Sequence, residues 1–274
     1  MIEIGNVKVG AGLPFVLIAG PCVIENEEMT LFTAEQIKII VSKLGIPFIF
    51  KSSYKKANRT SINSFKGIGD SQAIKILGMV KEKYKIPVLT DVHSPEEVQI
   101  AAEVSDVLQI PAFLCRQTEL LVAAGKSGKA VNIKKGQFLA PGDMKHAIEK
   151  VESTGNKKIM LTERGSTFGY NNLIVDMRSL VIMREFGYPV VMDATHSVQQ
   201  PGSGGRTGGQ PAFIKPLAKA AAAIGIDALF LEVHPNPPKA LSDSDSQLPL
   251  SELEKLLIEV KEIDTLVKKH ISQF

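Results

Sequence analysis

Short hydrophobic runs recur along the chain, and polar or charged stretches separate them. The runs lie at residues 15–20, 47–53, 87–92, 107–112, 130–136, 158–165, 189–196 and 228–235. They are rich in Val, Ile, Leu and Phe and are apolar on both faces, which is typical of strands buried in a parallel sheet. Three of them begin at a proline, which a strand tolerates at its first residue. We therefore expect eight buried parallel strands.

The stretches between these runs have helical spacing. Residues 27–45 carry one apolar stripe, which consists of Leu31, Ala34, Ile37, Val41 and Leu44, and Gly45 can end that helix. Ser94 precedes Pro95 as an N-cap precedes a first helical residue. Eight strand–helix units in a chain of this length predict a (β/α)8 barrel. The rival is an open doubly wound sheet, but "AGPCVIEN" after the first strand is not the glycine-rich fingerprint of that fold.

The first residues form a different pattern. The segment "IEIGNVKVG" alternates in period two around Gly5 and Asn6, so it predicts a small β-hairpin. Because it precedes the first barrel strand, we expect it to close the N-terminal end of the barrel. The expected organisation is one domain over residues 1–274, with the hairpin at 1–12 and the barrel at 13–274.

Composition and charge narrow the function classes. The chain has 274 residues, is 44% hydrophobic and carries a net charge of +3, which is too small to indicate nucleic-acid binding. Its apolar runs are too short to span a membrane, and its start lacks the form of a signal peptide. Two cysteines, Cys22 and Cys115, do not make a disulfide framework, so a reduced cytoplasmic location is expected.

Polar residues gather where the predicted strands end. In strand order they are Cys22, Lys51, Asp91, Gln109, Lys134, Glu163 with Arg164, Asp193 with His196, and Glu232 with His234. The active sites of (β/α)8 barrels lie at these carboxyl ends. We therefore expect an enzyme with a polar active-site mouth.

One arc of this ring suits a metal ion. Once the barrel closes, the first, seventh and eighth strands are neighbours, and they supply Cys22, His196 and Glu232. The loop after the eighth strand adds Asp243 or Asp245. Thiolate, imidazole and carboxylates make a plausible four-ligand divalent metal site. The alternative is that Cys22 packs as a small apolar residue, as free cysteines commonly do.

The opposite arc is cationic. Lys51, Lys134 and Arg164 interrupt or end apolar strands, and the loop "KSSYKKANRTS" adds further cations. Several cations beside a metal suggest a substrate with more than one phosphate or carboxylate group. Residue types alone predict a metal-assisted enzyme of multiply anionic small molecules and leave its reaction open.

Several motifs identify a family. "AGPCVIE", "KSSYKKANRTS", "QIPAFLCRQTELL", "NIKKGQFLAP", "LTERGSTFGYNNLIVDMRSL", "DATHSVQ" and "KALSDSDSQLPL" closely resemble the 3-deoxy-D-manno-octulosonate 8-phosphate synthases. The likeness runs from about residue 15 to about residue 257. It implies a (β/α)8 barrel, usually a homotetramer, that condenses phosphoenolpyruvate with D-arabinose 5-phosphate and releases phosphate during synthesis of the Kdo sugar of lipopolysaccharide.

The resemblance also implies residue roles. Substrate contacts would come from Lys51, Lys56, Asn58, Arg59, Thr60, Asp91, Gln109, Ala112, Phe113, Arg116, Lys134 and Arg164. Lys134 and Arg164 would hold phosphoenolpyruvate, with Lys56 and Gln109 beside them. The string Asn58 to Thr60 would bind the sugar phosphate, although its third position is usually serine. Phe113 and Arg116 would be lent across a subunit interface, and catalytic roles would fall to Lys56, Asn58, Lys134, His196 and Asp243.

The family has metal-dependent and metal-independent branches, which the residue after "GP" separates. Cysteine at this position implies the metal-dependent branch, with Cys22, His196, Glu232 and Asp243 as ligands of one divalent ion, Fe, Zn, Mn or Co. The segment "LEVHPNPPKALSD" is equally similar to the sister 3-deoxy-D-arabino-heptulosonate 7-phosphate synthases, which use erythrose 4-phosphate. The strings "KANRTS" and "IPAF" favour the five-carbon sugar. A Schiff-base aldolase using Lys51 or Lys134, and a non-catalytic sugar-phosphate sensor, are the remaining alternatives.

Overall fold

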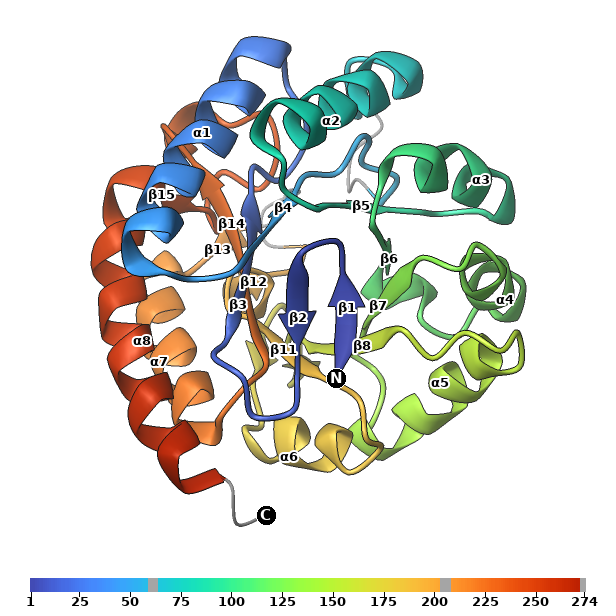
Figure 1. Cartoon of the computed structure of the whole chain (residues 1–274), viewed down its shortest axis with the longest axis vertical. Helices are drawn as coiled ribbons and strands as arrows, with labels where there is room; N and C mark the ends of the chain where they lie inside the picture. The colour runs from blue at the N-terminus through green and yellow to red at the C-terminus, as the bar shows by residue number, and fades with distance from the viewer. Residues whose placement is uncertain (59–63, 203–207, 272–274) are drawn as a thin grey trace.

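A closed parallel sheet organises the molecule. The computed structural model describes residues 1–58, 64–202 and 208–271, and within these ranges eight parallel strands and eight helices alternate (Figure 1). The strands are β3 (Val16–Gly20), β4 (Phe48–Lys51), β5 (Val88–Asp91), β6 (Val107–Ile110), β7 (Ala130–Lys134), β8 (Ile159–Glu163), β11 (Val190–Asp193) and β14 (Ala228–His234). The sheet closes because β14 pairs with both β3 and β11. The predicted (β/α)8 barrel is confirmed.

The helices cover the outside of the barrel. They are α1 (Glu27–Leu44), α2 (Asp70–Tyr84), α3 (Pro95–Val104), α4 (Thr118–Lys126), α5 (Met144–Glu152), α6 (Arg178–Arg184), α7 (Ile214–Ile224) and α8 (Leu250–Ile271). In α1 the Asn26 side chain caps the first turn, and Gly45 ends the helix at φ 64°, which glycine adopts without a Cβ clash. Ile37 and Val41 are buried between α1 and the barrel, as the apolar spacing predicts.

The N-terminal hairpin closes one end of the barrel. Strands β1 (Ile2–Ile4) and β2 (Val7–Val9) pair antiparallel and lie across the barrel opening in Figure 1. Their buried side chains form one cluster with interior residues of the barrel strands: Val16, Ile18, Ile49, Leu89, Val107, Ala130, Met160, Val191, Ala228 and Phe230. The expected plug of the N-terminal end is therefore confirmed.

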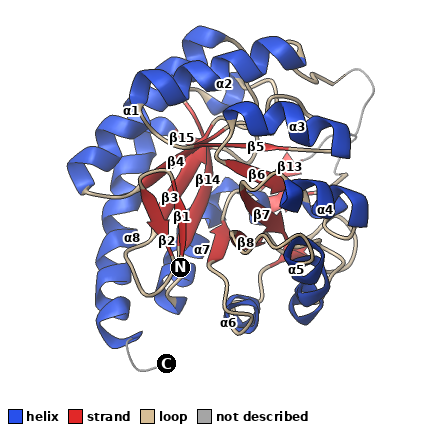
Figure 2. Cartoon of the chain, turned by 45° about the vertical axis from the view of Figure 1, so that its right-hand side comes forward, coloured by secondary structure: helices blue, strands red, loops and turns tan. Residues whose placement is uncertain are grey.

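Short strand pairs lie in the loops at the carboxyl end of the barrel strands. They are β9 (Ser166–Thr167) with β10 (Leu173–Ile174), β12 (Gln199–Gln200) with β13 (Gly208–Gly209), and β15 (Leu248–Pro249) beside β14. Figure 2 shows the hairpin of β1 and β2 against the barrel strands. None of the helices in the described ranges combines the length and apolar character that crossing a bilayer requires.

Candidate active site

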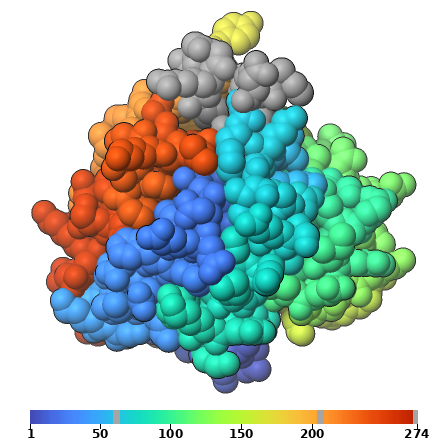
Figure 3. Space-filling view, turned by 90° about the horizontal axis from the view of Figure 1, so that it is seen from above, coloured from blue at the N-terminus to red at the C-terminus, as the bar shows by residue number. Residues whose placement is uncertain are grey.

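The carboxyl ends of the barrel strands surround a cavity of about 530 Å³. Sequence-predicted residues that line it are Lys56, Asn58, Asp91, Gln109, Ala112, Phe113, Lys134, Arg164, His196 and Asp243. The hairpin lies at the bottom edge of Figure 3 and the loop after β14 lies toward the top, so the cavity and the plug occupy opposite ends. Residues from distant parts of the sequence meet here because parallel strands bring all their carboxyl ends to one side.

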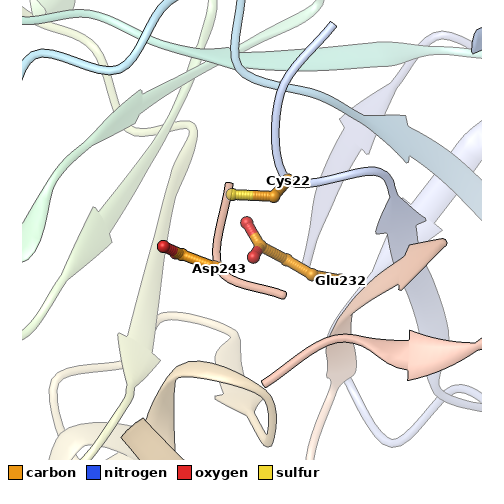
Figure 4. A group of neighbouring side chains, drawn as sticks. All are labelled: Cys22, Glu232 and Asp243. Carbon is orange, nitrogen blue, oxygen red and sulfur yellow. The ribbon is translucent and has the colours of Figure 1, made fainter. Parts of the chain in front are cut away.

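A thiol and two carboxylates converge beside the cavity. Figure 4 shows Cys22, Glu232 and Asp243 turned toward one another from the end of β3, from β14 and from the loop after β14. The three ligand atoms lie within 4.8 Å of one another. Of the two aspartates that the sequence leaves open, the structure places Asp243 in this group. Cys22 and Glu232 are buried.

Close backbone packing sets the position of Cys22. A Cβ added to Gly20 would lie 2.0 Å from the carbonyl oxygen of Lys51, so the end of β3 approaches β4 more closely than any other residue allows. The Cys22 N–H donates to Oε1 of Gln247 (3.2 Å), and Sγ donates to Oγ of Ser242 (3.1 Å). Burial raises the pKa of the Cys22 thiol well above its ordinary value, and the Asp243 and Glu232 carboxylates raise it further. A bound cation would reverse this effect and favour the thiolate.

His196 lies beside this group in a fixed orientation. Its Nδ1 is 2.7 Å from Oδ2 of Asp193, and its Nε2 faces Glu232 Oε1 at 3.5 Å and Asp243 Oδ2 at 4.0 Å. Although burial raises the pKa of Asp193, the charges of His196 and Lys134 hold it well below its usual range. An ionised carboxylate on one ring nitrogen directs the other toward a metal, as in many histidine-ligated sites.

The chemistry of these residues fits a divalent metal ion. Oε2 of Glu232 is buried and has no hydrogen-bond partner among the described residues, so the carboxylate has an unused oxygen that could ligate a cation. Sulfur, imidazole nitrogen and carboxylate oxygen together suit Fe, Zn, Mn or Co. Such an ion could be held by Cys22, Glu232 and Asp243, together with the neighbouring His196.

Buried lysines border the metal-ligating group. Nζ of Lys51 is 2.6 Å from Glu232 Oε1, and Nζ of Lys134 is 2.6 Å from Asp193 Oδ2. Burial lowers the pKa of Lys134, which Asp193 opposes. For Lys56, burial also acts to lower the pKa, but the electrostatic interactions with Cys22 and then with the Glu232 carboxylate raise it well above its ordinary value. Lys56 and Lys134 therefore bring positive charge to the cavity wall.

Phe230 forms an aromatic floor beneath two of these cations. Its ring centroid lies 4.1 Å from Nζ of Lys134 and 5.5 Å from Nζ of Lys51. The face of an aromatic ring attracts a cation, and the attraction is stronger where water is excluded. Phe230 thus helps to hold both ammonium groups in a buried position.

Arg164 is buried with part of its guanidinium unpaired. The Glu163 carboxylate accepts hydrogen bonds from the backbone N–H groups of Arg164 (2.9 Å) and Gly165 (2.6 Å), which fixes the turn after β8. Nη2 of Arg164 donates to Oε1 of Gln199 at 2.8 Å, whereas Nη1 has no partner among the described residues. Burial lowers the pKa of Arg164, although nearby carboxylates, first Asp193, oppose the shift. A buried cation with an unused donor suits an anionic substrate group.

A row of polar side chains crosses the barrel interior from β5 to β8. Asp91 accepts from Ser53 Oγ (2.6 Å) and from Gln109 Nε2 (2.5 Å). Gln109 Oε1 accepts from Asn132 (2.9 Å), whose amide oxygen accepts from Thr162 (2.6 Å). Burial raises the pKa of Asp91, but Lys51, Lys56 and other cations outweigh it and hold that pKa below its ordinary value. The row therefore presents an ionised Asp91 in a fixed orientation.

The remaining predicted residues lie in different surroundings. Lys51 is buried beneath the cavity and does not line it. Arg116 borders a separate hollow with Cys115 and Lys150, and Phe113 is exposed at the cavity rim. The predictions for Arg59 and Thr60 lie outside the described residues. The role of each predicted residue stays a prediction.

Sequence reasoning missed some residues of the cavity wall. His93 lines the cavity, and its Nδ1 lies 2.9 Å from Oε2 of Glu97. It follows Asp91 by two residues, so the strand-end rule could have found it. Gln199 lines the cavity from a glycine-rich loop, where no periodicity marks it.

Comparison with known proteins agrees with this geometry. The family model for the DAHP synthetase I family matches residues 1–269. The chain belongs to that family. It is 59% identical over 268 residues to a 2-dehydro-3-deoxyphosphooctonate aldolase of Geobacter metallireducens, which covers 97% of this chain and 98% of the relative. Proteins of the same name from Trichlorobacter lovleyi and Desulfatibacillum aliphaticivorans are 59% identical over 268 residues and 60% identical over 253 residues.

These relatives confirm the likeness that the sequence motifs indicate. The name 2-dehydro-3-deoxyphosphooctonate aldolase denotes the 3-deoxy-D-manno-octulosonate 8-phosphate synthases. The Desulfatibacillum protein aligns with 92% of this chain and 93% of its own length, and the Trichlorobacter protein with 97% and 98%. The similarity thus covers the strands, the loops and the cavity together.

Proposed function

We propose that this chain condenses phosphoenolpyruvate with D-arabinose 5-phosphate and water to give 3-deoxy-D-manno-octulosonate 8-phosphate and inorganic phosphate. The observation that carries the proposal is the 59% identity, over nearly the whole chain, with relatives named 2-dehydro-3-deoxyphosphooctonate aldolase. The cavity supports it, because Lys56, Lys134 and Arg164 surround the space with positive charge and both substrates are multiply anionic. The product would serve synthesis of the Kdo sugar of lipopolysaccharide.

The reaction is a group transfer to the aldose. C3 of phosphoenolpyruvate attacks the aldehyde carbon of the open-chain sugar, and a carbon–carbon bond forms. Water adds at C2, and the hemiketal phosphate then loses phosphate by C–O cleavage, which leaves a ketone. Lys134 and Arg164 neutralise phosphoenolpyruvate and stabilise the charge that develops at C2, since both cations are buried where electrostatic interactions are strong.

The metal-ligating group completes the proposed site. Cys22, His196, Glu232 and Asp243 would hold one divalent ion, Fe, Zn, Mn or Co. When bound, the ion supplies a positive charge that acidifies a water or polarises the aldehyde. Asp193 keeps the Nε2 of His196 turned toward the carboxylates.

The proposal also covers the binding of the sugar phosphate and the oligomeric state. Asn58, Arg59 and Thr60 would bind the phosphate of arabinose 5-phosphate, and Asp91 would lie near its hydroxyl groups. Phe113 and Arg116 would reach a neighbouring subunit of a homotetramer, in which each chain is a single domain. The enzyme would work in the cytoplasm.

An assay of phosphate release tests the proposal. The enzyme would receive phosphoenolpyruvate with either arabinose 5-phosphate or erythrose 4-phosphate, before and after treatment with a strong chelator. We expect activity with the pentose that disappears on chelation and returns with added divalent metal. Lys134→Met should lower kcat/KM about 10²- to 10³-fold, the usual effect of removing one group that stabilises transition-state charge. Activity with erythrose 4-phosphate alone would assign the chain to the sister reaction.

A further inference from the structure

The Gln199 side chain joins two parts of the site. It lies on β12, three residues after His196, and is 8% exposed. Its Oε1 accepts a hydrogen bond from Nη2 of Arg164 at 2.8 Å, and its Nε2 donates to Oδ2 of Asp243 at 3.1 Å. A guanidinium has only donors and an ionised carboxylate only acceptors, so an amide suits the position between them because it offers one group of each kind. The two hydrogen bonds together fix which way the amide points.

A close backbone contact also joins the strand that carries Gln199 to the loop that carries Asp243. Gln199 pairs with Gly209 of β13, and a Cβ added to Gly209 would lie 2.4 Å from the carbonyl oxygen of Asp245. Asp245 is in the loop that carries Asp243, and Ser246 donates its N–H to the carbonyl of Asp243 at 3.1 Å. The β12–β13 pair therefore rests directly on the backbone that positions Asp243.

Asp243 depends on this support because its backbone is strained. Its φ of 49° lies in the left-handed region, which costs a non-glycine residue free energy unless neighbouring contacts hold it. On its other side, Gln247 donates to the carbonyl of Ser242 at 2.9 Å and accepts from the N–H of Cys22 at 3.2 Å. Contacts from β12, from β13 and from Cys22 after β3 thus support the backbone and the carboxylate of Asp243.

We infer that Gln199 is a positioning residue that ties the orientation of Arg164, on the phosphoenolpyruvate side, to that of Asp243, on the metal side. The inference rests on the proposed function and adds a residue and a physical connection to it. Because the same amide holds a side chain at each end, its loss should weaken binding of both metal and phosphoenolpyruvate. A side chain that merely filled the cavity wall would affect stability and leave both affinities unchanged.

The test compares Gln199→Met with Gln200→Met. Methionine keeps the length of the side chain and removes both hydrogen bonds. Gln200 is the next residue of β12 and does not line the cavity, so it receives the same chemical change as a matched control. Zn²⁺ and Co²⁺ affinities come from equilibrium dialysis of the stripped protein, and KM for each substrate from phosphate release. Thermal unfolding checks that each variant is folded.

We expect Gln199→Met to bind metal about 10- to 100-fold more weakly, the usual effect of losing a partner of a metal ligand. KM for phosphoenolpyruvate should rise about tenfold, because Arg164 loses a charge-assisted hydrogen bond, while KM for arabinose 5-phosphate stays within twofold. The control should match the wild type. Gly209→Ala should weaken metal binding with less change in KM for phosphoenolpyruvate, since it displaces the Asp245 backbone and leaves the Gln199–Arg164 hydrogen bond in place.

Two failures can be told apart. If wild-type protein binds metal and releases phosphate but Gln199→Met has unchanged metal affinity and unchanged KM for phosphoenolpyruvate, the positioning role is overturned. If the wild type neither binds metal nor releases phosphate from these substrates, the proposed function itself fails. A folded Gln199→Met with weaker metal binding and a selective rise in KM for phosphoenolpyruvate supports the inference.

Discussion

The two ends of the barrel interior are built from the same strands and have opposite chemistry. Toward the N-terminal end, Ile49, Leu89 and Phe230 belong to the buried apolar cluster that packs against the hairpin. Two residues later on the same strands come Lys51, Asp91 and Glu232, which are buried and ionisable. Side chains alternate along a strand, so residues two apart point to the same side. A distance of two residues along each strand therefore separates the apolar core under the hairpin from the polar site.

The difference shows how such a barrel carries a costly charged site. Burying an unpaired charge is strongly unfavourable, so each ionised group needs partners. The apolar end supplies a rigid frame of packed side chains, and the frame holds the partners at ion-pair distance, for example Lys134 and Asp193 at 2.6 Å. The apolar end stabilises the fold. Part of this stability offsets the free-energy cost of burying charged groups at the cavity end.

The largest expected effect comes from breaking an ion pair at the polar end. Lys51→Met leaves Glu232 without its closest cation, and removing one partner of a buried pair costs about 3–5 kcal/mol of unfolding free energy. Lys43→Met is the matched control, because the Lys43–Glu254 pair at 2.5 Å is largely exposed and such pairs contribute about 0–1 kcal/mol. Urea unfolding of the metal-free proteins measures both changes.

Added metal should affect the two variants differently. A divalent ion would give Glu232 an additional counter-charge beside Lys56, so excess Zn²⁺ should reduce the loss caused by Lys51→Met and leave the loss caused by Lys43→Met unchanged. Equal losses of unfolding free energy for the two variants in metal-free protein would contradict the idea that the buried pair contributes more to stability than the exposed pair.

Most of the fold could be predicted from the sequence, and the reason is physical. Strands buried on both faces read as uninterrupted apolar runs, and the same runs end at Lys51, Asp91 and Lys134 where the interior becomes polar. The depth of each side chain could not be predicted in this way. The sequence predicts Lys51 as a substrate ligand and does not give its depth. The structure places it under the cavity against Glu232, at a depth that depends on the stagger between neighbouring strands.

The contacts between loops could not be predicted from the sequence either. Gln199 is in a glycine-rich stretch without periodicity, and its two partners are 35 and 44 residues away along the chain. Asp193 ends a predicted strand, but its role in orienting His196 depends on a turn that brings the two together. Such contacts follow from the closed barrel and its loops, and local pattern does not carry them.

An intermediate effect is expected from Asp91, and it should depend on pH. The folded pKa of Asp91 is below its ordinary value, so its ionisation stabilises the fold above about pH 4, the unfolded value, and this contribution is lost as pH falls through the folded pKa. Asp91→Asn should cost about 1–3 kcal/mol at pH 7, since it weakens hydrogen bonds to a charged group. The difference between wild type and variant should shrink below about pH 4.

Urea unfolding of both proteins between pH 7 and pH 3 measures that difference. Carboxylates elsewhere titrate alike in the two proteins and cancel. A difference that stays constant over the whole range would mean that the cations around Asp91 do not stabilise its ionised form.

The smallest effect should come from the apolar end. Ile18 is fully buried in the cluster that joins the hairpin to the barrel strands. Ile18→Val removes one methylene there and should cost about 0.5–1.5 kcal/mol of unfolding free energy. Because the cavity and the plug lie at opposite ends, kcat/KM and metal affinity should stay within twofold of the wild type. A loss of activity larger than the loss of folded protein would show that the plug helps to position the charged residues and that the two ends do not act separately.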